Sequence, residues 1–291
     1  MTRHTSHSKK SDARLAIIAG YGRLPIDVAL AAREQGIDPY ILALQGEADQ
    51  DWRDFDHIDL PIANFSKAVK TLRSQNVDRI VLAGGVRKRP RIADIRPTFK
   101  LLFSLPKLLK VIRSGGDDAL LSLTINLFEM HGVKVVGAQE IVPNLLAQKG
   151  VLGAVATSPQ NQADIKIASI AASQIGRDDK GQAAVAINGQ VVATEGADGT
   201  DAMLSALAEK FGSDTSTKKQ GVLVKLSKPQ QERRADLPTI GPLSVINADQ
   251  AGLSGIAVEA GRSFILDKEN VIKEADKRGM FIAGISREAS E

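Results

Sequence analysis

The sequence predicts an α/β protein of two domains, the first with a parallel sheet and the second with a mixed sheet. Three observations lead to this fold class. Short apolar runs alternate with helix-period segments in the first half, and the second half contains a β-hairpin pattern. In addition, the chain has 291 residues and 43% hydrophobic side chains, which is enough material for two separate cores.

The first half starts with a strand, a tight turn and a helix. Leu15–Ala19 is an apolar run, Gly20-Tyr21-Gly22 follows it, and Ile26–Gln35 has its apolar residues at helical spacing. Further strands are expected at 40–44, 79–83 and 133–136, with helices at 64–75 and 117–131. Because strands and helices alternate, we expect a Rossmann-like parallel sheet covered by helices.

The second half has a different pattern. Two apolar runs, 183–187 and 190–194, flank Asn188-Gly189, which is the signal of a hairpin with a type I′ turn. Thr200 is expected to cap a helix over 201–210, and 221–226 reads as a strand. The segments 263–266, 268–277 and 280–285 then predict strand, helix and strand. A hairpin beside such units predicts a mixed sheet.

The change in pattern places a domain boundary between residues 145 and 165, a stretch with Gly150, Gly153 and Pro159. We therefore expect a disordered leader at 1–12, an N-terminal domain at 13–150 and a C-terminal domain at 151–291. The apolar run after the leader is too short for a signal peptide. No run approaches the roughly 18 apolar residues that a membrane span needs, so we expect a cytoplasmic protein.

The composition argues against several kinds of site. There is no cysteine, which excludes disulfides, thiolate nucleophiles and cysteine-bound metals. The four histidines have no metal-ligand spacing. Only 4% of the residues are aromatic and the net charge is +4, so we expect no nucleic-acid partner, whereas an anionic small ligand is compatible.

Two glycine-rich turns follow predicted strands in the first half. Gly20, Tyr21 and Gly22 form the first; Gly84 and Gly85 form the second, which continues into a cationic stretch at 87–91. Ligands of open α/β sheets bind at the carboxyl ends of strands, so both turns are expected to face one crevice and approach a phosphate. The alternatives are a tight turn without a ligand and a solvated basic loop.

Other polar groups lie at predicted helix starts. Asp117 and Asp118 follow two glycines, and Thr200 and Asp201 follow Gly199. Each pair is explained either by helix capping or by contact with a cation or a ligand hydroxyl.

Between the glycine turns and Asp117, the segment 95–113 mixes apolar and cationic residues. Such a segment suits either a contact with acyl chains or a membrane, or two core helices broken at a proline.

The longest polar loop follows the predicted strand 221–226. It contains cations, amides and a lone aspartate after its only glutamate, and Pro-Thr-Ile-Gly at its end is expected to form a turn. Loops held by a scaffold often contain functional residues, so this loop is either a site for a phosphate-bearing ligand or an ordinary surface connection. Its candidate residues are Lys225, Lys228, Gln231, Arg234, Asp236 and Thr239.

Six segments, in order, resemble the UDP-2,3-diacylglucosamine pyrophosphatases of the LpxI type. They span nearly the whole chain after the leader: 18–25 (IAGYGRLP), 83–86 (AGGV), 116–121 (GDDALL), 199–204 (GTDAML), 228–241 (KPQQERRADLPTIG) and 255–262 (GIAVEAGR). Tyr21 departs from the pattern, because family members have a third glycine there.

The resemblance implies a reaction, a cofactor and partners. The reaction is hydrolysis of UDP-2,3-diacylglucosamine to UMP and 2,3-diacylglucosamine 1-phosphate (lipid X) in lipid A synthesis, with Mg²⁺ or a similar divalent cation. It also implies a ligand held between the two domains, a homodimer and peripheral contact with the inner membrane.

The resemblance also gives roles to the candidate residues. The essential aspartate of the family falls on Asp236, which is thus the expected catalytic residue and the candidate metal ligand. The remaining candidates are expected to bind the substrate: Gly20, Tyr21, Gly22, Gly84, Gly85, Asp117, Asp118, Thr200, Asp201, Lys225, Lys228, Gln231, Arg234 and Thr239.

Two other functions stay open from the residues alone. The first is a nucleotide-dependent oxidoreductase of the Rossmann type, which Gly20 and Gly22 favour. Pro25 at the third glycine position and the lack of an acid after the run 42–45 count against it. The second is a non-enzymatic protein that binds a nucleotide or a lipid.

Overall fold

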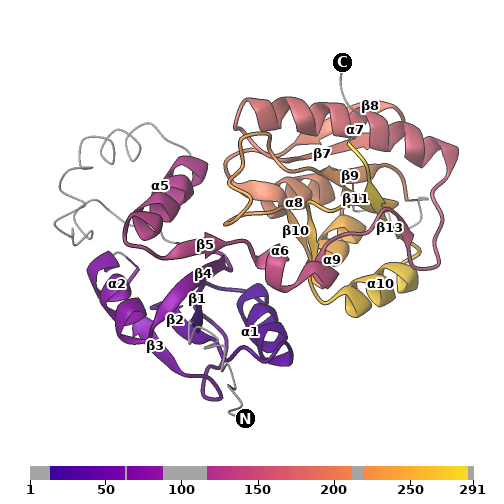
Figure 1. The fold of residues 1–291 in the computed structure, drawn as a ribbon. Helices are drawn as coiled ribbons and strands as arrows, with labels where there is room; N and C mark the ends of the chain where they lie inside the picture. Colours follow the sequence, from indigo (N-terminus) through magenta and orange to yellow (C-terminus); the bar gives the residue numbers. More distant parts are fainter. Residues whose placement is uncertain (1–13, 63, 88–116, 212–218, 288–291) are drawn as a thin grey trace, which may run out of the picture. The chain divides into compact units, whose positions relative to one another are not determined.

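The computed structural model describes residues 14–62, 64–87, 117–211 and 219–287, and it gives no side-chain burial for 117, 118 and 211. The chain folds into two compact units, an N-terminal unit, Met1–Val142, and a C-terminal unit, Pro143–Glu291 (Figure 1). The leader at 1–12, the segment 95–113 and the cations after Arg87 in the stretch 87–91 lie outside the described residues.

The N-terminal unit is built on a parallel five-stranded sheet. The strands are β1 (Arg14–Ala19), β2 (Tyr40–Leu44), β3 (His57–Leu60), β4 (Val77–Ala83) and β5 (Lys134–Val136). Their order is β3-β2-β1-β4-β5, which is the Rossmann order, so this prediction is confirmed. The order reverses between β1 and β4, where both glycine turns follow their strands.

Helices cover both faces of this sheet. They are α1 (Leu24–Glu34), α2 (Phe65–Ser74), α5 (Asp117–Met130) and α6 (Ala138–Ile141). Figure 1 shows α1 on one face and α2 beside α5 on the other. The rings of Phe65 in α2 and Phe128 in α5 lie 4.7 Å apart, centroid to centroid, which joins these two helices.

The C-terminal unit contains the predicted mixed sheet. Its strands are β6 (Gly150–Leu152), β7 (Ala183–Ile187), β8 (Gln190–Thr194), β9 (Val222–Lys225), β11 (Gly255–Glu259) and β13 (Phe281–Ile285), in the order β6-β13-β11-β9-β7-β8. Strands β13, β11 and β9 are parallel, and β6 and the hairpin β7–β8 are antiparallel to their neighbours. The short strands β10 (Thr239–Ile240) and β12 (Phe264–Ile265) form a separate parallel pair.

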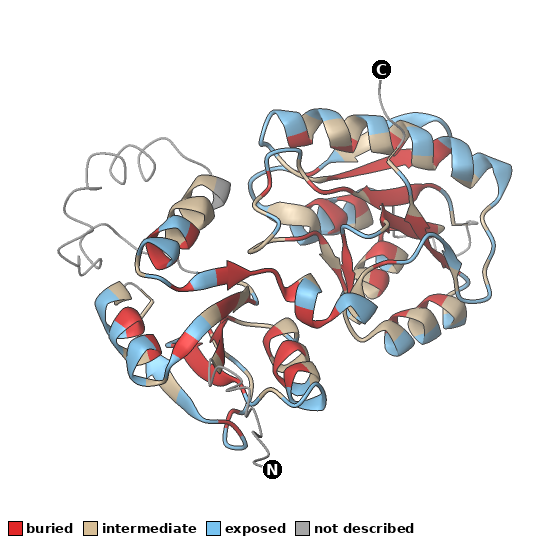
Figure 2. Ribbon diagram, viewed as in Figure 1, coloured by how far each residue is buried: buried red, intermediate tan, exposed pale blue. Residues whose placement is uncertain are grey.

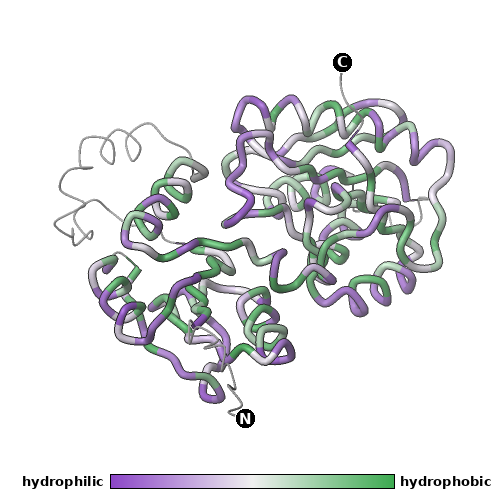
Figure 3. The backbone as a smooth tube through the Cα atoms, in the orientation of Figure 1, coloured by the Kyte–Doolittle hydropathy of each residue, from purple (hydrophilic) through white to green (hydrophobic). Residues whose placement is uncertain are grey.

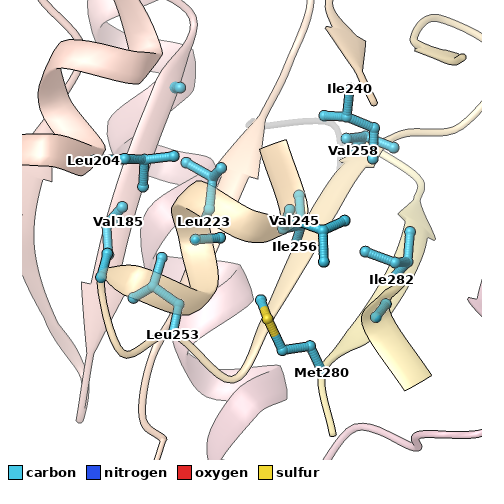
Figure 4. Packing of buried hydrophobic residues seen from close by; sticks show 14 of the residues in the cluster. Val185, Leu204, Leu223, Ile240, Val245, Leu253, Ile256, Val258, Met280 and Ile282 are labelled. Carbon is cyan, nitrogen blue, oxygen red and sulfur yellow. The ribbon is translucent and has the colours of Figure 1, made fainter. Parts of the chain in front are cut away.

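Alternating side chains give this sheet two apolar faces. Ala184 and Ala186 in β7 pack with the small residues Ala168 and Ala172 of α7 (Pro159–Arg177). Val185, between them, belongs to the larger core on the opposite face, under α8 (Gly199–Phe211), α9 (Pro242–Gln250) and α10 (Lys268–Lys277). Figure 4 shows this core, with Val185, Leu223 and Ile256 from three strands among the labelled side chains.

The result is a three-layer unit with α7 on one face of the sheet and α8, α9 and α10 on the other. Its inner strands β7, β9, β11 and β13 are mostly buried, whereas the edge strands β6 and β8 and the outer sides of the helices are more exposed (Figure 2). Hydrophilic residues accordingly line the outside of α7 and α10 (Figure 3). No described helix is long and apolar enough to cross a membrane.

The division between the units comes a few residues before the expected boundary at 150. Residues just after Val142 join the C-terminal unit because Leu146 forms a β-bridge with Phe264 and the Ala147 amide donates to the Ser263 carbonyl. The Asn188-Gly189 turn has φ of 52° and 80°, as a type I′ hairpin requires, so the hairpin prediction is confirmed.

Candidate functional site

Residues of the C-terminal unit gather where β9 and β11 end. Parallel strands have their carboxyl ends at one edge of a sheet, and β8, which leads into α8, also ends there because Thr194 is paired with Ala184 near the start of β7. Crevices at such edges are the usual ligand sites of α/β folds. The edge therefore brings together the loop after β9, the end of β11 and the entry to α8.

Asp236 lies in the loop between β9 and β10 and is half-buried. Its amide donates to the Glu232 carbonyl at 3.0 Å, which closes a turn, and its Oδ2 accepts from Gln231 Nε2 at 2.6 Å. Among the described residues, Oδ1 of Asp236 has no hydrogen-bond or ion-pair partner. One carboxylate oxygen is thus fixed and the other is open to a ligand, a metal ion or water.

The cations of this loop differ in how firmly they are held. Lys225 Nζ donates to the Thr239 carbonyl at 3.3 Å, which ties the end of β9 to β10. Lys228 Nζ lies 2.7 Å from Asp179 Oδ1, just beyond the end of α7, and its side chain is only 15% exposed. Of the two lysines, Lys225 is thus the one whose charge is not paired with a described carboxylate.

Arg234 binds Glu232 through both Nε and a terminal nitrogen, at 2.9 and 2.8 Å. This hydrogen bonding holds the pKa of Glu232 below its usual range, although burial raises it in part. Glu232 therefore stays ionised as a partner of Arg234. A phosphate that binds Arg234 has to share it with this carboxylate.

A buried glutamate that the candidate set did not include holds the start of the loop. Glu259, at the end of β11, is 3% exposed, and its Oε2 accepts from the Ser227 amide at 2.9 Å and the Ser227 hydroxyl at 2.6 Å. Arg287 lies 3.2 Å from the same oxygen and also donates to the Ser227 carbonyl. Two signals in the sequence pointed to it: an acid directly after the apolar run 256–258, and its place in the family-like segment 255–262.

Thr200 and Asp201 lie in the first turn of α8. The prediction that Thr200 caps this helix is wrong, because α8 begins at Gly199 and the Thr200 hydroxyl donates instead to Glu195 Oε1 at 2.5 Å. Glu195, which is 8% exposed, also accepts from the Gln182 amide. Asp201 Oδ1 accepts from Asn247 of α9 at 3.0 Å. A hollow of about 370 Å³ lies beside this turn, lined by β8, the 196–199 loop and α8.

The two glycine turns of the N-terminal unit lie directly against each other. Tyr21 and Gly85 exchange backbone hydrogen bonds of 2.8 and 2.9 Å. A Cβ on Gly20 would come within 2.1 Å of the Gly85 carbonyl oxygen, and a Cβ on Gly84 within 2.6 Å of the backbone carbonyl oxygen of Tyr21. These glycines are required because the turns touch, whether or not a ligand binds there.

Carboxylates of the loop after β2 already occupy amides of both turns. Asp49 Oδ1 accepts from the Gly22 amide at 2.9 Å, and the buried Glu47 accepts from the Arg87 amide at 2.8 Å. The Tyr21 ring fills the space beside Gly85, with the Arg87 guanidinium 3.9 Å from its centroid. A phosphate at Gly22 has to replace Asp49.

The structure thus divides the predicted site residues between the two units. Asp117 and Asp118 begin α5, and their side chains are not described. No group of three His, Asp or Glu side chains among the described residues is placed to hold a metal ion. Within the C-terminal unit, hydrogen bonds link Lys228 to Gln231, Gln231 to Asp236, and Lys225 to Thr239.

Fold and site together define an α/β protein with two units and a polar, partly cationic site at the carboxyl edge of a sheet, the arrangement typical of proteins that act on phosphate-bearing ligands. The models of the LpxI N-terminal and C-terminal domains match residues 14–145 and 148–283. The chain is also 39% identical to the UDP-2,3-diacylglucosamine pyrophosphatase LpxI of Caulobacter vibrioides, over 94% of this chain and 97% of that protein. The chain belongs to the LpxI family.

Proposed function

We propose that this protein hydrolyses UDP-2,3-diacylglucosamine to UMP and 2,3-diacylglucosamine 1-phosphate, a step of lipid A synthesis. The observation that carries the proposal is the 39% identity to a pyrophosphatase named for this substrate, which extends over both units. The geometry around Asp236 supports it, since an aspartate with one oxygen fixed and the other open stands in a loop with Lys225 and Arg234.

Asp236 is the proposed catalytic residue. Its Oδ1 orients a water molecule or accepts its proton while Gln231 holds Oδ2. The water attacks the phosphorus on the sugar side, and UMP leaves with the bond electrons. Lys225 and Arg234 neutralise the charge that develops on the phosphate oxygens.

Mg²⁺, or another divalent cation, is the proposed cofactor. Such ions are commonly held by one or two protein carboxylates together with substrate phosphates. The Oδ1 atom of Asp236 is the donor that fits, and the bound ion would shield the diphosphate charge.

Further parts of the proposal rest on the family resemblance. Several further residues are proposed to line the substrate site: Gly20, Tyr21, Gly22, Gly84, Gly85, Asp117, Asp118, Thr200, Asp201, Lys228 and Thr239. A homodimer in the cytoplasm, in peripheral contact with the inner membrane that contains the acylated product, is proposed on the same ground. The oxidoreductase alternative is disfavoured because Pro25 stands at the third glycine position of the dinucleotide pattern and the matching relative is a pyrophosphatase.

The test is release of UMP from UDP-2,3-diacylglucosamine by the full chain, with Mg²⁺ and with a chelator. We expect Asp236→Ala to fold and to bind substrate, but to release UMP at least about 10³-fold more slowly, as removal of a principal catalytic group does. Asp178→Ala is the matched control, because Asp178 is exposed and pairs only with Lys180 among the described residues. Tight NADH binding by a wild type that leaves the substrate intact would sink the proposal, and wild-type turnover by Asp236→Ala would remove this residue from the mechanism.

A further inference from the structure

Gln231 is one of the few polar residues that the C-terminal unit buries, with 5% of its surface exposed. Both ends of its side-chain amide are used. Oε1 accepts from the Lys228 amide at 3.0 Å, and Nε2 donates to Asp236 Oδ2 at 2.6 Å. The Gln231 backbone amide also donates to the Lys228 carbonyl, at 3.2 Å, so the residue is fixed at three points within the loop.

The orientation of this amide follows from its partners. A backbone N–H can only donate, so the atom that faces Lys228 has to be the oxygen. With the oxygen facing Lys228, the atom that faces Asp236 is the nitrogen, which donates to Oδ2. Turning the amide over would place donor against donor at one end and acceptor against acceptor at the other. The chain therefore determines which atom Asp236 meets.

We propose that Gln231 is a positioning residue that holds Asp236 in one orientation, rather than a group that binds the substrate itself. This inference rests on the proposed function of Asp236. Both ends of the Gln231 amide are hydrogen-bonded within the loop, and only 5% of the residue surface is exposed, so little of the side chain is accessible to a ligand. Its contribution is to fix Oδ2 and so to aim Oδ1, the oxygen without a described partner.

The chain offers a matched control at the next residue. Gln230 is exposed, and its Nε2 donates to the Gly176 carbonyl at 2.9 Å, at the end of α7, with no bond to Asp236. Gln230→Glu and Gln231→Glu add the same charge one residue apart. Only Gln231→Glu places a carboxyl group against the Asp236 carboxylate.

The first experiment measures kcat and KM for UMP release by the wild type, Gln231→Glu and Gln230→Glu. We expect Gln231→Glu to lower kcat about 10–100-fold with KM within about twofold of the wild type, as loss of a supporting hydrogen bond does. Loss of a substrate contact would raise KM instead. Gln230→Glu keeps the wild-type kcat and KM. A wild-type kcat in Gln231→Glu, or a raised KM with unchanged kcat, overturns the inference.

The second experiment needs no activity and separates this inference from the proposed function. The unfolding free energies of the wild type, Gln231→Glu, Asp236→Asn and the double variant are compared at one pH, close to neutral. We expect Gln231→Glu to lose stability, and Asp236→Asn to remove most of that loss in the double variant, because two carboxyl groups no longer face each other. Additive effects of the two substitutions overturn the inference even when the wild type releases no UMP.

Discussion

Replacing Glu259 by alanine is expected to lower the free energy of unfolding by about 3–5 kcal/mol. The substitution removes a buried carboxylate and leaves the groups that donate to it without an acceptor. Three hydrogen bonds end on its Oε2, two from Ser227 and one from Arg287. The buried Ser227 amide alone, once unpaired, costs about 1–3 kcal/mol. The Arg287 side chain is 26% exposed and keeps part of its hydration, so the total stays within this range.

Glu259→Gln separates hydrogen bonding from charge. The glutamine oxygen can still accept from Ser227, so only the attraction to Arg287 and to Arg262, 3.6 Å from the other oxygen, is lost. We expect a loss of roughly 1–2 kcal/mol, the difference between a charged and a neutral acceptor. We expect UMP release to fall more in Glu259→Ala than in Glu259→Gln, since Ser227 lies near the start of the loop that contains Asp236.

The assay is urea unfolding followed by two signals. Far-UV circular dichroism reports both units, whereas fluorescence reports the N-terminal unit, because the single tryptophan of the chain, Trp52, is buried there. Glu269→Ala is the control, since Glu269 is exposed on α10. The reasoning is refuted when Glu259→Ala is no less stable than Glu269→Ala, or when Glu259→Gln is as damaging as Glu259→Ala.

Two further predictions concern stability. Burial raises the pKa of Asp249, but hydrogen bonds from Lys219 and Arg278 lower it by more, so the folded pKa lies below the usual value. A depressed folded pKa gives stability that is present above the unfolded pKa of about 4 and is lost as pH falls through the folded value. Urea unfolding should therefore show Asp249→Asn less stable than the wild type at pH 7, with the gap closing below about pH 4; a gap that does not change with pH contradicts this. Gly20→Ala should destabilise the N-terminal unit by about 1–3 kcal/mol, since the new Cβ would clash with the Gly85 carbonyl and the backbone there would have to move. An unchanged urea midpoint of Trp52 fluorescence contradicts this prediction.

Elements with a strong local pattern could be predicted from the sequence. The hairpin at Asn188-Gly189 and strand β2, Tyr40–Leu44, are found where they were expected. In contrast, α7 gave no clear periodic signal, because it packs through small residues such as Ala168 and Ala172 rather than through large apolar ones. Strand β3 was missed because His57–Leu60 is mostly exposed or half-buried at the edge of its sheet.

The candidate site could be predicted only where its contacts are local. Gln231 and Asp236 are five residues apart in one loop, and both were in the candidate set. Glu259 lies 32 residues from Ser227, and only the pairing of β9 with β11 brings them together. The Pro-Thr-Ile-Gly stretch was expected to turn, but Thr239 and Ile240 instead form strand β10 against β12, a pairing that depends on residues far along the chain.

The carboxylate of Asp49 at the Gly22 amide has a consequence for ligand binding to the N-terminal unit. An arriving anion competes with a group of the same charge that is tethered to the chain and thus present at high effective concentration. Anion affinity at that turn is then set by the difference between two similar contacts, and we expect it to rise when Asp49 is replaced by a neutral residue. Asp49 therefore competes with anions for the Gly22 amide. Anions that bind weakly at this turn are disfavoured, whereas a ligand with many other contacts can still displace the carboxylate.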